Sequence, residues 1–114
     1  MKGLSLLAAL ALVASLGAGE RLKVRVSHTA KLAPAELLVQ AIVEPAAENG
    51  ALEVVAESAD FYRSSLVQLD GLHSPRVSCI WFAQMPAGTY EVSVRVLTRD
   101  GGELAAETES VIIG

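Results

Sequence analysis

The sequence has a single cysteine, Cys79, so no disulfide can form within the chain. It has only two histidines, His28 and His73, and no cysteine or histidine pair at the spacing of a zinc site. It also lacks a Gly-x-Ser-x-Gly sequence, a His-Glu-x-x-His sequence and a phosphate-binding glycine loop. These absences predict a protein that is not an enzyme and that holds no metal and no cofactor.

Positive charge is scarce as well. The 114 residues include 9 Lys and Arg against 13 Asp and Glu, which leaves a formal net charge of −4. Proteins that bind nucleic acid normally present a basic face, so we expect no nucleic-acid partner. The length predicts one domain.

One long apolar run is present, at the N-terminus. Lys2 precedes the apolar residues 4–16, and small residues follow at 17–19. This order is typical of a secretory signal peptide. The alternative, a membrane-spanning helix, needs about 20 apolar residues, and this run is shorter. We therefore expect a helical signal peptide over residues 1–19, no membrane span after its cleavage, and export by a bacterium to the periplasm or the medium.

Residues 20–114 alternate between apolar and polar side chains in short segments. In the segment 22–28, for example, Leu22, Val24 and Val26 share one face, as in a half-buried strand. Further strands are expected at 37–44, 51–58, 66–69, 76–82, 90–96 and 103–113. About seven short strands separated by turn signals indicate a single antiparallel β-sandwich.

Two strands are ambiguous in phase. In 76–82 both faces are apolar; we expect Ile80 and Phe82 in the core, with Trp81 on the outer face or beneath a loop. Cys79 is interpreted as a small half-buried hydrophobe, with an intermolecular disulfide or a reactive thiol as the alternative. In 103–113 no single frame buries every apolar residue, which predicts a bulge.

The segment 60–65 is the least regular of the mature chain. We favour a connection that is pinned to the core by Phe61. The alternative is a recognition loop that exposes Tyr62 and Arg63, two residue types enriched at interface hot spots.

A turn with Pro86 and Gly88 precedes the strand that begins near Tyr90. Pro86 presets φ, and Gly88 tolerates a positive φ. The stretch 85–94, with the later Asp100-Gly101-Gly102 hairpin, resembles a fibronectin type III or immunoglobulin-like domain. The resemblance implies this β-sandwich fold for residues 20–114. It also implies that Tyr90 packs its ring into the core and hydrogen-bonds upstream backbone, the tyrosine corner. The chain departs from these families in lacking a cysteine pair and a tryptophan in its second or third strand.

This fold hosts many functions, so three remain open. We expect a non-catalytic module that contacts another protein in the envelope or outside the cell. The first alternative is a carbohydrate or small-ligand module with Tyr62, Arg63 and Trp81 as contacts. The second is a structural subunit that assembles by strand addition at an apolar edge of the last strand.

N-terminal sequencing of the exported protein is expected to find a first residue between Ala18 and Glu20, because small residues precede these positions. Full-length protein in the cytosol would contradict export.

Overall fold

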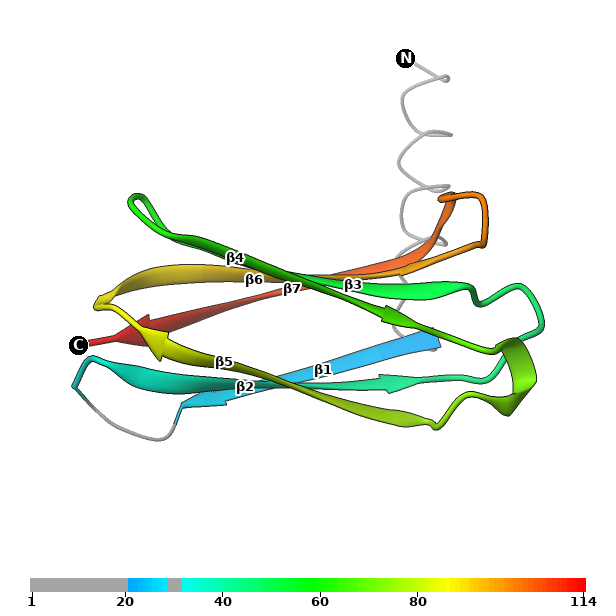
Figure 1. Cartoon of the computed structure of the whole chain (residues 1–114), viewed down its shortest axis with the longest axis horizontal. Coiled ribbons are helices and arrows are strands. Elements are labelled where there is room, and N and C mark those ends of the chain that lie inside the picture. The colour runs from blue at the N-terminus through cyan, green and yellow to red at the C-terminus, as the bar shows by residue number, and fades with distance from the viewer. Residues whose placement is uncertain (1–20, 29–31) are drawn as a thin grey trace, which may run out of the picture.

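A computed structural model describes residues 21–28 and 32–114 of the chain. The expected signal peptide, residues 1–19, lies outside the described residues. Within them, seven strands form two antiparallel sheets that face each other (Figure 1), which confirms the all-β prediction. The strands are β1 (Leu22–His28), β2 (Ala35–Val43), β3 (Ala51–Glu57), β4 (Tyr62–Gln68), β5 (Val77–Met85), β6 (Gly88–Leu97) and β7 (Glu103–Ile113). No helix in the described ranges has the length and hydropathy of a membrane span.

The two sheets have three and four strands. Their orders are β1-β2-β5 and β4-β3-β6-β7, so the chain crosses from one sheet to the other after β2, β4 and β5. At one edge of the sandwich β1 lies against β7. The chain enters β1 at one end of the sandwich, and the C-terminus lies at the other end (Figure 1).

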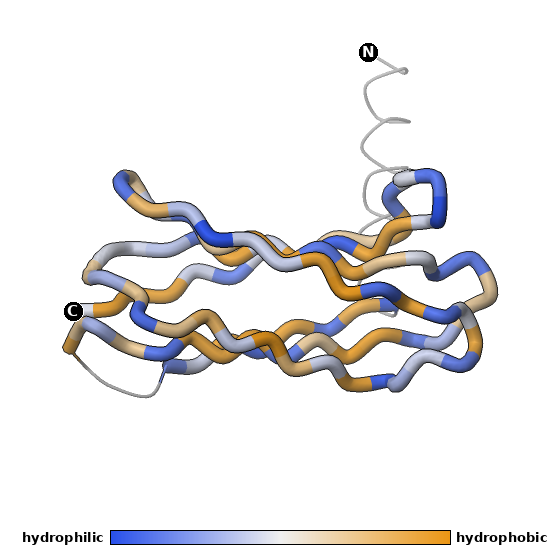
Figure 2. Tube along the Cα trace, in the orientation of Figure 1, coloured by the Kyte–Doolittle hydropathy of each residue, from blue (hydrophilic) through white to orange (hydrophobic). Residues whose placement is uncertain are grey.

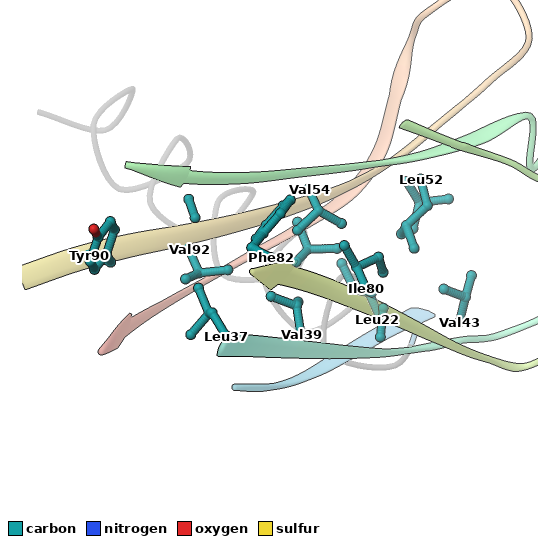
Figure 3. Close-up of a cluster of buried hydrophobic side chains, with 14 of the residues drawn as sticks. Leu22, Leu37, Val39, Val43, Leu52, Val54, Ile80, Phe82, Tyr90 and Val92 are labelled. Carbon is teal, nitrogen blue, oxygen red and sulfur yellow. The ribbon is translucent and has the colours of Figure 1, made fainter. Parts of the chain in front are cut away.

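The core lies between the sheets and follows the two-residue period of the strands. Figure 2 shows this alternation along the chain, and Figure 3 shows the side chains that meet in the core. In β2, β3 and β6 alternate residues are buried, as the alternation of these segments predicts. Full burial of a side chain such as Leu or Val stabilises the fold by about 1.5–3 kcal/mol. The largest fully buried side chains are Tyr90, Leu22, Leu37, Leu52, Met85 and Ile113.

Tyr90 anchors the crossing from β5 to β6. Its ring is fully buried, and its hydroxyl donates a hydrogen bond of 2.7 Å to the carbonyl oxygen of Pro86. The Phe61 ring packs edge-on against it, with the ring centroids 6.4 Å apart. Gly88 does not adopt the positive φ that the turn suggested; it begins β6, where a Cβ would lie 3.3 Å from the Cβ of Ser58.

A bulge settles the phase of β5. The pairing with β2 shifts between Ala35 and Leu37, and Gln84 has a φ of 59°. One extra residue in a strand turns the following side chains to the opposite face. Ile80 and Phe82 are therefore buried before the bulge and Met85 after it, while Trp81 lies on the outer face.

One strand boundary differs from the prediction, and the bulge expected in 103–113 is confirmed. The segment 60–65 was expected to be irregular, but β4 already begins at Tyr62 and pairs with β3 along its whole length. In β7 a register shift opposite Val96 and Leu97 falls at the start of the strand. After this shift the pairing with β6 is regular, and alternate residues from Ala105 to Ile113 face the core. Ile112 therefore lies on the outer face and is exposed.

Two substitutions of Tyr90 are expected to distinguish the contribution of its hydroxyl hydrogen bond to stability from that of its buried ring. Tyr90→Phe should lower the free energy of unfolding by about 0.5–1.5 kcal/mol, because it removes one hydrogen bond. Tyr90→Ala should lower it by about 3–5 kcal/mol, because it leaves a cavity. Urea unfolding measures both changes. Tyr62→Phe is the control, since that tyrosine is 58% exposed; equal losses for Tyr62→Phe and Tyr90→Phe would contradict the anchor role.

Candidate functional site

The outer face of the three-stranded sheet carries a strip of apolar side chains on β2 and β5. The strand register places Leu38 beside Trp81 and Ile42 beside Val77. Trp81 is 54% exposed and Val77 45%, whereas Leu38 and Ile42 are half-buried. Contiguous exposed apolar surface is typical of interaction sites. The uncharged pair Gln40–Cys79 lies between these two rows, and we call the three rows together the apolar strip.

Two basic residues border the apolar strip on β1. Lys23 pairs with Ile42 and Arg25 with Gln40 across the β1–β2 ladder, and both are exposed. No ion pair joins either cation to another residue in the described ranges. The face therefore combines an apolar centre with positive charge along one side, which suits a partner with apolar and acidic groups.

The outer face of the four-stranded sheet is different. Arg95 donates to the Glu53 carboxylate from Nε at 2.8 Å, and its guanidinium lies 3.5 Å from Glu103. The hydrogen bond to Glu53 raises the pKa of Arg95 above its usual value. The exposed Tyr62 and Leu66 are each paired with a glutamate of β3, so they do not join into a strip. Exposed ion pairs contribute little to stability, and this face is best understood as a solvated one.

Arg63 lies between the two sheets, where β4 and β5 form an edge of the sandwich. Its Nη1 donates to the carbonyl oxygen of Ala83 at 3.1 Å. Its guanidinium carbon lies 5.7 Å from the centroid of the Phe82 ring, within the range of a cation–π contact. These contacts tie β4 to β5 and hold the side chain at this edge.

The three candidate binding residues do not form one site. Tyr62 lies on the outer face of the four-stranded sheet and Trp81 on the outer face of the other sheet, with Arg63 between the sheets. The contact between Phe61 and Tyr90 fits the favoured interpretation of this segment, in which Phe61 is pinned to the core.

Cys79 is exposed rather than half-buried. The phase of β5 turns its side chain outward, in the row between Val77 and Trp81. Among the described residues, no group of three His, Cys, Asp or Glu side chains is placed to hold a metal ion.

Sequence reasoning missed the apolar strip, although a signal for it was present. The ambiguous phase of β5 arose because its residues are apolar on both faces, and one of those faces must lie outside the core. No protein-family model matches the chain, and no curated protein matches its sequence. The functional inference therefore rests on the chain's own residues.

The Cys79 thiol is expected to react with a disulfide reagent in the folded protein as completely as in urea, because its side chain is exposed. Release of the coloured thiolate measures the reaction. Ile80→Cys in a Cys79→Ser background is the matched control and should react slowly, since position 80 is buried. Similar rates at the two positions would contradict the assigned phase of β5.

Proposed function

We propose that this chain is an exported, non-catalytic β-sandwich module that binds another protein through the apolar strip. The observation that carries the proposal is the contrast between the outer faces. One places the apolar pairs Leu38–Trp81 and Ile42–Val77 on either side of the uncharged pair Gln40–Cys79, and the other pairs its exposed apolar residues with glutamates. Exposed apolar surface costs solubility, and a bound partner would cover it.

The strand order supports a fibronectin type III-like rather than an immunoglobulin-like module. Constant-type immunoglobulin domains place the fourth strand in the sheet of the first, second and fifth strands. Here β4 instead pairs with β3. The hydrogen bond from Tyr90 to Pro86 supports the tyrosine corner that such sandwiches share. The pattern of residues 1–19 supports export, and with it a location of the domain at 20–114 in the periplasm or outside the cell.

A protein fits the apolar strip better than a carbohydrate does. Carbohydrate sites combine aromatic rings with several convergent hydrogen-bonding groups. Among the described residues, Trp81 is the one aromatic side chain on this face, and the rest of the strip is aliphatic apart from Cys79 and Gln40. Aliphatic side chains around a tryptophan match the core of a protein interface, and the cations of β1 match its polar rim.

Retention of envelope proteins on the immobilised processed protein tests this function. Trp81→Ser is expected to weaken retention of a specific partner at least about tenfold, which corresponds to 1.4 kcal/mol, because it removes the anchor of the strip. Tyr62→Ser is the matched control: it removes an aromatic side chain of similar exposure from the other face.

Equal retention by Trp81→Ser and the unmodified protein would refute the proposal. Quenching of the Trp81 fluorescence by envelope polysaccharide, with no protein retained, would favour the carbohydrate alternative instead.

A further inference from the structure

Sheet edges present unpaired backbone groups, and proteins protect them against pairing with another chain. Charged side chains, inward-pointing charges, proline and bulges are the usual devices. Four described strands lie at edges: β1 and β5 of one sheet, and β4 and β7 of the other. They differ sharply in this protection.

Three of these edge strands carry charge. β1 has Lys23 and Arg25, and β4 has Arg63 on its inward side. In β7, Glu107 and Glu109 share the phase of the buried Ala105 and Ile113, so these carboxylates point toward the other sheet. A strand added beside β7 would have to cover them. The last strand therefore lacks the apolar edge that the second alternative function, assembly by strand addition, requires.

β5 is the unprotected edge. Its sequence, Val-Ser-Cys-Ile-Trp-Phe-Ala-Gln-Met, has no charged residue, no proline and no glycine. Valine, isoleucine, tryptophan and phenylalanine all favour strands. The bulge at Gln84 lies near the far end of the strand and leaves the stretch 77–82 regular.

The β2 ladder shows which backbone groups of β5 are free. The amide of Val43 donates to the carbonyl of Arg76 at 2.7 Å, so Arg76 faces β2. Residues of an antiparallel strand alternate in the direction of their hydrogen bonds. Ser78 and Ile80 therefore also face β2, and the amides and carbonyls of Val77, Cys79 and Trp81 face away from it.

A separate contact supports this alternation. Ala83 is the next residue after Trp81 in the outward set, and its carbonyl accepts the hydrogen bond from Arg63. Arg63 thus occupies the carbonyl oxygen of Ala83, which lies beyond Trp81. The backbone groups of Val77, Cys79 and Trp81 that face away from β2 are not involved in this contact. The stretch from Val77 to Trp81 stays open for a strand.

We infer that β5 pairs antiparallel with β5 of a second copy, about a two-fold axis at Cys79. This inference rests on the proposed function as a contact module, and it adds self-association through the edge of β5, which leaves the apolar strip open to its partner. With Cys79 opposite the partner's Cys79, Val77 lies opposite the partner's Trp81. In the Cys79–Cys79 pair and in both Val77–Trp81 pairs, the two residues exchange two backbone hydrogen bonds. Any other register leaves the backbone groups of at least one of Val77, Cys79 and Trp81 without a partner.

The chemistry of the strand allows this self-pairing. A two-fold axis places identical side chains close together, so a charged residue at the centre of the strand would repel its copy. β5 carries no charge, and the pairs across the axis are apolar. The three-stranded sheets of the two copies then form one continuous sheet, and their apolar strips join on its outer face. One strand pair is smaller than a standard interface, so the dimer is weak and concentration-dependent.

Sedimentation of the purified processed protein over a range of concentrations tests this dimer. Cys79→Lys sets two ammonium groups against each other at the axis and should weaken association at least about tenfold, with partial recovery at high salt. Cys79→Ser and Thr108→Lys are the controls. The first keeps the strand uncharged, and the second adds the same charge to the exposed face of the edge strand β7. Both should leave association unchanged.

Cross-linking tests the register. In an antiparallel ladder, two opposite residues that exchange both backbone hydrogen bonds have Cα atoms about 5.5 Å apart. This distance lies within the range of a disulfide. Copper phenanthroline with oxygen should remove two electrons and two protons from a pair of Cys79 thiols and link the dimer. In a Cys79→Ser background, a mixture of Val77→Cys and Trp81→Cys chains should form the mixed disulfide, while neither variant alone should link efficiently.

A chain that stays monomeric at all concentrations, or a dimer that is insensitive to Cys79→Lys, would overturn the inference. If such a monomer still loses its envelope partner on Trp81→Ser, the proposed function stands without self-pairing. A monomer that loses that partner on Cys79→Lys but not on Thr108→Lys also overturns self-pairing, because the added charge lies within the apolar strip that the partner covers. Failure of both association and retention would remove both proposals.

Discussion

The hydrogen bond from the Tyr90 hydroxyl to the Pro86 carbonyl holds the crossing between the two sheets, and the rest of the sandwich depends on this crossing. Met85 and Tyr90 are both fully buried, so the connection is fixed in the core at both ends. With Met85 fixed, the bulge at Gln84 decides which residues of β5 face outward. The exposure of Trp81, the apolar strip and the free backbone groups of β5 all follow from that phase.

The parts of the fold that could be predicted are those in which one face of a strand is clearly polar. In β6, Glu91, Ser93 and Arg95 alternate with aliphatic residues, and a one-residue slip would bury charge. The period of two then identifies both the strand and its inner face. Tyr90 could be placed in the same way, because a known turn pattern precedes it.

The first half of β4 was not predicted, whereas the expected phase of β5, with Ile80 and Phe82 in the core and Trp81 outside it, is confirmed although the sequence left it ambiguous. The first half of β4 has small polar residues and an arginine, and it forms a strand because it pairs with β3 and because Arg63 reaches β5. β5 is apolar on both faces, so its phase depends on a bulge that only the packed structure reveals. The candidate site shares this limit: Trp81 was identified from the sequence, but its neighbours Leu38 and Ile42 belong to another strand, and only the register brings them together.

The two ends of the chain also have a consequence for how copies of this domain would be arranged in a longer polypeptide. The start of β1 and the C-terminus lie at opposite ends of the sandwich (Figure 1). A domain fused after Gly114 would leave along the long axis, so tandem copies would form an extended rod. One side of the rod would carry the unpaired edge of β5 on every unit. Two such rods would then associate laterally through repeated β5–β5 pairing.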